Sequence, residues 1–229
     1  MGEHGETTTP PTVLVADDHW ALAAGLALLL DTAGLPAVAA SDPHDVVAEA
    51  ERLRPAVVLL DLRLGDGTTS VHHIPALVGL GCRVLVLTGV TDPVELGRAL
   101  EAGAAGIVLK TSDPDTVVTS VRNTLAGRKA SRDHYSLRCL DELRAARRHR
   151  QDQYAPFERL TAREAAVLAD MMRGLPADAI AAAHYVSLAT VRSQIRAVLQ
   201  KLGVNSQLAA VAMAHRCGWS PDHRTEPAA

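Results

Sequence analysis

Five short apolar runs, each followed by a helix-like segment, constrain what the first half of this chain can fold into. The runs lie at residues 13–16, 36–40, 56–60, 83–87 and 106–109. Runs that are wholly apolar and alternate with helices are typical of a parallel sheet that helices cover on both faces. We therefore expect a (βα)5 domain with a five-stranded parallel sheet.

The helices of this half have recurrent start signals. Asp42-Pro43, Asp92-Pro93 and Asp113-Pro114 each place an N-cap residue before a proline at the first helical position. They predict helices over about residues 42–54, 92–102 and 113–126. A helix is also expected at residues 21–30, and a weaker one near residues 71–80, after a loop at Gly65-Asp66-Gly67.

Polar side chains stand where four of the predicted strands end. They are Asp17, Asp18, Asp61, Thr88 and Lys110. Ligands of parallel sheets bind at the carboxyl ends of the strands, so we expect these side chains to converge. Packed carboxylates need a cation, and oxygen ligands suit Mg²⁺. Mg²⁺ on Asp18 and Asp61 would leave an Asp61 oxygen to accept a phosphoryl group, whose charge Lys110 and Thr88 would offset.

The second half of the chain is helical in pattern. It opens with a capping box at Thr161 and Glu164, and four short helices follow. Residues 177–184 and 187–203 form two of them, joined by a tight turn, which is the outline of a helix-turn-helix. The second of these has an apolar stripe and an opposite face without acids, formed by Arg192, Ser193, Gln194, Arg196 and Gln200. Such a helix enters the major groove of DNA.

The net charge of −3 hides a gradient along the chain. Residues 1–126 have a net charge of −9, residues 127–153 of +4 and residues 154–229 of +2. This asymmetry indicates an acidic module joined to a part compatible with nucleic acid. An arginine-rich linker helix is expected at Tyr135–Gln151. No apolar run spans a bilayer, no signal-peptide pattern occurs, and the three cysteines are scattered, so we expect a cytoplasmic protein that is not in a membrane.

Seven motifs in this order resemble one known family. In the first half they are Val-Ala-Asp17-Asp18-His, Leu-Leu-Asp61-Leu-Arg, Leu-Thr88-Gly and Gly106-Ile-Val-Leu-Lys110. In the second half they are Leu160-Thr-Ala-Arg-Glu164, Thr190-Val-Arg192 and Lys201-Leu-Gly. The chain resembles a bacterial two-component response regulator of the NarL/FixJ type. The resemblance implies a flavodoxin-like (βα)5 receiver followed by an all-α, LuxR-type helix-turn-helix domain of four helices.

The expected domain limits follow from this division. Residues 1–11 are expected to be disordered, residues 12–127 to form the receiver domain and residues 128–158 a partly helical linker. Residues 159–218 are expected to form the DNA-binding domain, and residues 219–229 a loose tail.

The resemblance also implies roles for individual residues. Asp61 would be the phosphoacceptor, with Thr88 and Lys110 sensing the phosphoryl group. Mg²⁺ would be held by Asp17, Asp18, Asp61 and the backbone carbonyl of Arg63. The residues expected to contact DNA are Thr190, Arg192, Ser193, Gln194, Arg196 and Lys201.

Partners and alternatives follow from the same residues. A sensor histidine kinase and double-stranded DNA are the expected partners, and a homodimer is expected at least on DNA. The chain departs from the family at Ile107, where a switch aromatic is usual, and at Ala179 and Leu188 in the helix-turn-helix. Ile107 motivates an alternative, a regulator that binds DNA without phosphorylation. Two further alternatives are a Mg²⁺-dependent phosphohydrolase using Asp61, although we expect no enzyme, and a protein-interaction module.

Overall fold

A computed structural model describes residues 12–40, 42, 45–64, 68–128 and 134–221 of the chain. They form two compact units, an N-terminal unit up to Ala145 and a C-terminal unit from Ala146 onward. Several expectations lie outside the described residues: the N-terminal segment 1–11, Pro43, the Gly65-Asp66-Gly67 loop and the tail from residue 222.

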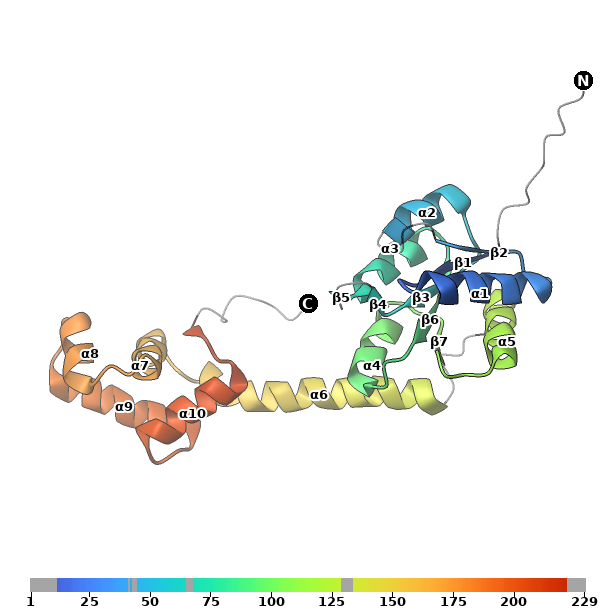
Figure 1. The fold of residues 1–229 in the computed structure, drawn as a ribbon. Helices are drawn as coiled ribbons and strands as arrows, with labels where there is room; N and C mark the ends of the chain where they lie inside the picture. Colours follow the sequence, from blue (N-terminus) through green and yellow to red (C-terminus); the bar gives the residue numbers. More distant parts are fainter. Residues whose placement is uncertain (1–11, 41, 43–44, 65–67, 129–133, 222–229) are drawn as a thin grey trace, which may run out of the picture. The chain divides into compact units, whose positions relative to one another are not determined.

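The N-terminal unit contains the expected five-stranded parallel sheet (Figure 1). Its strands are β1 (Val13–Ala16), β2 (Ala37–Ala39), β3 (Val57–Asp61), β6 (Arg83–Thr88) and β7 (Gly106–Leu109). Their order is β2-β1-β3-β6-β7, so the chain leaves β1 for one edge and then returns to build the other. The switch point lies between β1 and β3, where ligands of such sheets bind.

Helices cover both faces of this sheet. On one face are α1 (Trp20–Thr32) and α5 (Pro114–Leu125), which bury alanines, leucines and valines against it. On the other face are α2 (Val46–Leu53), α3 (Ile74–Gly79) and α4 (Pro93–Glu101). Every residue of β1 and β3 is buried, which explains why these runs contain no alternating polar residues.

Two of the three predicted Asp-Pro helix starts are confirmed. Asp92 accepts a hydrogen bond from the amide of Val94 at 3.0 Å, and Asp113 accepts one from Thr116 at 2.8 Å. The start at Asp42 was placed too early, because α2 begins at Val46 with Asp45 at its N-cap. The Asp42 carbonyl instead accepts the Asp45 amide at 3.1 Å, in a turn that precedes the helix.

The segment after β3 also differs from the prediction. Two-residue strands β4 (Arg63–Leu64) and β5 (Thr68–Thr69) pair antiparallel. A 3-10 helix, η2 (Ser70–His73), then replaces the first turn of the helix expected near residues 71–80. Thr69 caps η2 by accepting a hydrogen bond from the amide of Val71 at 3.4 Å.

A single long helix, α6 (His134–Glu158), replaces the shorter linker helix expected at Tyr135–Gln151. Its first half packs in the N-terminal unit, where Cys139 and Leu143 are buried. They lie against Gly97 of α4, where an added Cβ would stand 2.5 Å from the Cys139 carbonyl oxygen. The arginines of α6 at 144, 147, 148 and 150 are exposed.

The C-terminal unit contains the four expected helices, α7 (Ala162–Met172), α8 (Ala177–Ala183), α9 (Leu188–Leu202) and α10 (Gln207–Cys217). The apolar stripe of α9 forms the centre of their core through Val191, Ile195, Val198 and Leu202. The last helix begins at Gln207, where the side chain of its N-cap, Ser206, accepts a hydrogen bond from the amide of Ala209. Among the described helices, none has the length and apolar character needed to cross a membrane.

Candidate functional site

Three of the predicted pocket residues meet at the carboxyl edge of the sheet. Asp17 follows β1, Asp61 ends β3, and both are buried. Lys110 follows β7 and brings its Nζ to 2.6 Å from Asp17 Oδ2 and 2.7 Å from Asp61 Oδ2. One ammonium group therefore bridges two buried carboxylates at the switch point of the sheet.

Burial and the ion pairs shift the ionisation of this group. Loss of solvent raises the pKa of Asp61, and the hydrogen bond and charge of Lys110 oppose that rise. For Lys110, burial works against the charged form, but hydrogen bonds to Asp17 and Asp61 outweigh it and raise the pKa. Lys110 is thus the main group that favours the ionised form of Asp61, with a smaller contribution from the Arg63 amide.

The predicted sensor residue Thr88 and the departure from the family at Ile107 lie on the neighbouring strands β6 and β7. Thr88 ends β6, is fully buried and accepts a hydrogen bond from the amide of Val90 at 3.0 Å. A hydroxyl that accepts this bond still has its own proton to donate. Ile107 pairs in register with Val86 inside the sheet and packs half-buried against the core under α2–α4. Thr88 thus lies at the carboxyl end of β6, where its carbonyl accepts a hydrogen bond from the Lys110 amide at 2.9 Å, whereas Ile107 is a packing residue within β7.

Asp18 is exposed and lies beside His19, which is not among the predicted site residues. The Nδ1 of His19 lies 2.8 Å from Asp18 Oδ1, and its amide donates to Asp17 Oδ1 at 2.9 Å. The hydrogen bond and charge of Asp18, together with the charge of Asp17, raise the pKa of His19. The sequence signal was the polar residue that directly follows the acidic pair.

The donor set of this pocket fits a divalent cation. Ligand atoms of Asp17, Asp18 and His19 all lie within 4.8 Å of one another. Asp61 is linked to them through Lys110, and the amide of Arg63 donates to Asp61 Oδ1 at 3.3 Å, so the backbone of Arg63 borders the pocket. Asp17 and Asp61 share the single ammonium group of Lys110, and Asp18 pairs with His19. This cluster of carboxylate oxygens suits a divalent cation that prefers oxygen ligands.

The predicted DNA-contacting residues lie on one helix, but they are not equally exposed. On α9, Thr190, Arg192, Ser193 and Arg196 are exposed, while Gln194 is half-buried. Arg192 and Arg196 stand one turn apart, and the Arg196 Nε donates to the Arg192 carbonyl at 3.4 Å. The Oγ1 of Thr190 lies 2.8 Å from the Oγ of Ser187, the N-cap of α9.

Lys201 has a different environment from the other five residues. Its Nζ donates to Glu164 Oε2 at 2.6 Å, and Glu164 also closes the capping box of α7 by accepting from the Thr161 amide at 2.7 Å. This contact joins the end of α9 to the start of α7. Lys201 therefore has a structural contact in the C-terminal unit, and its role in DNA binding stays a prediction.

Comparisons with known proteins decide the family. The model of the response regulator receiver domain matches residues 13–122, and that of the bacterial regulatory proteins of the luxR family matches residues 158–214. The nitrate/nitrite response regulator protein NarP of Escherichia coli (strain K12) is 34% identical over 206 residues, which cover 88% of this chain and 93% of NarP. The chain belongs to the response regulators with a LuxR-type DNA-binding domain.

Other similar proteins agree with this assignment. The response regulator protein VraR of Staphylococcus aureus (strain NCTC 8325 / PS 47) is 29% identical over 207 residues, which cover 87% of this chain and 93% of VraR. The crystal structure of a two-component response regulator of the LuxR family from Aurantimonas sp. SI85-9A1 is 28% identical. It has a TM-score of 0.50 and covers 58% of this chain and 96% of that one.

The family membership gives this response regulator its general function. It is a DNA-binding transcription regulator of a two-component system, with a receiver domain that answers to a sensor kinase. Receiver domains typically bind Mg²⁺ at an acidic pocket of the kind that Asp17, Asp18 and Asp61 form. His19 was not predicted as a site residue although it directly follows its partner Asp18. The Asp170–His184 and Glu164–Lys201 pairs were not predicted because their partners lie 14 and 37 positions apart in the chain.

Proposed function

We propose that this response regulator is switched by phosphoryl transfer to Asp61. The observation that supports it is the position of the Asp61 carboxylate, buried at the sheet edge with Oδ2 on Lys110 and Oδ1 at 3.3 Å from the Arg63 amide. In the reaction, a carboxylate oxygen attacks phosphorus, a P–O bond forms, and the P–N bond to the histidine of the sensor kinase breaks. The leaving imidazole keeps the electron pair and takes up a proton.

Lys110 and Thr88 are proposed to stabilise the product. The phosphoryl group adds negative charge beside Asp17, and the Lys110 ammonium is already within 2.7 Å of both acids. The buried Thr88 hydroxyl can donate its proton to a phosphoryl oxygen, since its oxygen already accepts from the Val90 amide. Preorganised donors of this kind cost little reorganisation at the moment of reaction.

Asp17, Asp18, Asp61 and the carbonyl of Arg63 are proposed to hold Mg²⁺. The excess of carboxylates over cations and the oxygen donors support this set. When bound, Mg²⁺ supplies charge that offsets the oxygens of the phosphoryl group. Asp18 would contribute a carboxylate oxygen to this site, and in the structure its Oδ1 lies against His19.

The output is proposed to be binding of α9 in the major groove. Arg192, Ser193 and Arg196 form its exposed face, with Thr190 and Gln194 at the margins. The N-terminal part of a recognition helix reads base edges, and dimers bind half-sites about 10 bp apart. A phosphorylation-dependent homodimer on DNA, acting in the cytoplasm where the chromosome lies, is consistent with this arrangement.

Ile107 motivates an alternative proposal, in which DNA binding does not need phosphorylation. An aliphatic side chain at this position packs into the core instead of offering an aromatic ring that changes position. Coupling between a phosphoryl site and an output site is typically about 1–3 kcal/mol. Phosphorylation should therefore tighten DNA binding about 5- to 150-fold if the switch works, and not at all if the alternative holds.

Two measurements test the proposal with full-length protein. Intact mass spectrometry after incubation with acetyl phosphate and Mg²⁺ should show one added phosphoryl group in the wild type and none in Asp61→Asn. A duplex selected by the wild type from a random-sequence pool then serves for affinity measurements with and without acetyl phosphate. Equal labelling of wild type and Asp61→Asn would contradict the assignment of Asp61.

A further inference from the structure

In the described part of the C-terminal unit, two charged side chains are buried, Glu164 and Asp170. Both lie on α7, and each is paired with a basic side chain of the helix-turn-helix. Glu164 pairs with Lys201, near the end of α9, and Asp170 pairs with His184, before its start. A buried carboxylate is costly unless it is paired, so these contacts are expected to persist in the folded domain.

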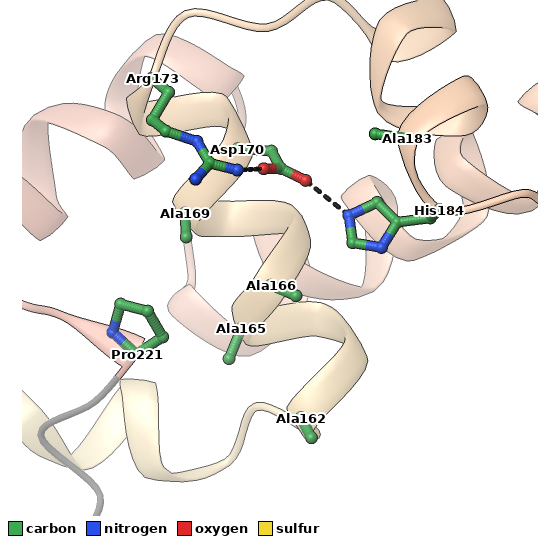
Figure 2. Close-up of a pocket in the computed structure, with 9 residues that line it drawn as sticks. All are labelled: Ala162, Ala165, Ala166, Ala169, Asp170, Arg173, Ala183, His184 and Pro221. Atoms are coloured by element: carbon green, nitrogen blue, oxygen red, sulfur yellow. Dashed lines mark hydrogen bonds and ion pairs between the residues drawn. The ribbon is translucent and has the colours of Figure 1, made fainter.

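Figure 2 shows the Asp170 carboxylate between two partners. One oxygen contacts Arg173, the C-cap residue of α7. The Arg173 side chain is 69% exposed. The other oxygen lies 2.6 Å from Nε2 of His184, whose side chain is only 20% exposed. The bond to His184 is the shielded one, and it joins residues 14 positions apart in the sequence.

His184 is the C-cap of α8 and begins the turn into α9. The next residue, Tyr185, has a φ of 54° and is 96% exposed, so its side chain does not anchor the turn by packing. A non-glycine residue in the left-handed region costs about 1–3 kcal/mol and persists only where its surroundings hold it. Two residues later, Ser187 caps α9 with a hydrogen bond to the amide of Thr190 at 3.1 Å.

We propose that Asp170 and His184 are positioning residues for DNA binding. Their contact connects α7 to the turn that precedes α9, and the contact of Glu164 with Lys201 connects α7 to the end of α9. The apolar stripe of α9 buries the helix against the core, but apolar packing is non-directional. The 2.6 Å hydrogen bond between His184 and Asp170 has a preferred geometry and therefore fixes the orientation of the turn before α9. The pair sets where Thr190 and Arg192 stand without itself reaching DNA. This inference rests on the proposed DNA-contacting face of α9.

The test uses two matched variants of the full-length protein, His184→Gln and His184→Asn. The side-chain amide of glutamine reaches the place of Nε2, whereas the shorter asparagine ends near the place of Nδ1 and does not reach Asp170. Both replacements are polar and uncharged. Arg173→Ala serves as a control, since it removes the exposed partner of Asp170 and leaves His184 in place.

Affinity is measured for the duplex that the wild type selects, at a temperature where circular dichroism shows each variant folded. We expect His184→Gln and Arg173→Ala to bind within about 3-fold of the wild type. We expect His184→Asn to bind about 10-fold more weakly, which corresponds to about 1.4 kcal/mol. Backbone amide NMR signals of residues 187–192 should shift in His184→Asn and return toward wild-type positions in His184→Gln.

Equal affinities of the glutamine and asparagine variants, whether both weak or both like the wild type, would overturn the proposal. Failure of the underlying function looks different. Arg192→Ala and Arg196→Ala would then leave the affinity for the selected duplex unchanged. If those two variants weaken binding while the two His184 variants stay alike, only the positioning role is lost.

Discussion

The ammonium group of Lys110 lies 2.7 Å from Asp61 Oδ2, and it lies 2.6 Å from Asp17 Oδ2. The residue that would accept the phosphoryl group therefore shares its counter-charge with a second buried acid. Burial raises the pKa of Asp61 despite Lys110, so ionising this carboxyl group in the folded receiver costs stability.

Asp61→Asn should therefore stabilise the receiver at neutral pH. A carboxyl group with a raised pKa contributes its full stability below its unfolded-state pKa and loses it as the pH rises through the folded-state pKa. The gain from the neutral amide is thus expected at pH 7, at about 0.5–2 kcal/mol, and should vanish near pH 3. Urea unfolding of both proteins across this range measures it. A variant that is less stable than the wild type at pH 7 would contradict the prediction.

Mg²⁺ should stabilise the wild-type protein if the acidic pocket binds it. At a Mg²⁺ concentration ten times the Kd, the expected gain in unfolding free energy is about 1.4 kcal/mol. Asp18→Asn removes a partly exposed ligand and should lose most of this gain while leaving the Lys110 bridge intact. Thermal unfolding with Mg²⁺ and with EDTA measures both. Asp113→Asn is a suitable control, because Asp113 caps α5 through Thr116 and takes no part in the pocket.

The sheet and its carboxyl-edge residues were predictable because they depend on local patterns. Strands buried on both faces read as apolar runs, and parallel topology brings their ends together whatever the loops do. The start of α2 was mispredicted because the Asp42 carbonyl accepts the Asp45 amide in an i to i+3 turn, and the α-helix begins only at Val46. The ion pair between Lys201 and Glu164 was not predicted, because the two residues lie 37 positions apart in the chain. Patterns along the chain do not report such pairings.

The Glu164–Lys201 pair predicts how the DNA-binding domain responds to acid. Burial alone would raise the pKa of Glu164, but hydrogen bonds from Lys201 and Thr161 outweigh it and lower the pKa. A lowered pKa gives stability that is present above the unfolded-state pKa and lost as the pH falls through the folded-state pKa. The wild type should therefore be more stable than Glu164→Gln at neutral pH, and this difference in unfolding free energy should shrink as the pH falls below about 4.3.

At pH 7 that variant should be less stable by about 1–3 kcal/mol, since glutamine leaves the Lys201 ammonium half-buried without its charge partner. Arg144→Ala is the control, because the Arg144–Asp141 pair is exposed on both sides and should contribute about 0–1 kcal/mol. Circular dichroism melts from pH 3 to pH 7 measure both variants. A difference between wild type and Glu164→Gln that does not change with pH would contradict the charge argument.

Gly97 and Gly25 make opposite predictions for the same substitution. Both lie inside helices, where alanine is better than glycine by about 1 kcal/mol. A Cβ at Gly25 of α1 meets nothing within 4 Å, so Gly25→Ala should stabilise the receiver by about 0.5–1 kcal/mol. A Cβ at Gly97 of α4 would stand 2.5 Å from the Cys139 carbonyl and 2.9 Å from Leu143 Cβ, so α6 would have to move away.

Gly97→Ala should therefore destabilise the protein by about 1–3 kcal/mol, despite its better helix propensity. Its displacement of α6 should expose Cys139, which is 1% exposed in the wild type. Thiol labelling under native conditions measures this exposure, and Cys139→Ala identifies the reacting group. Gly25→Ala should label as slowly as the wild type. If Gly97→Ala gains stability and Cys139 stays protected, the first half of α6 does not pack on α4 as the structure has it.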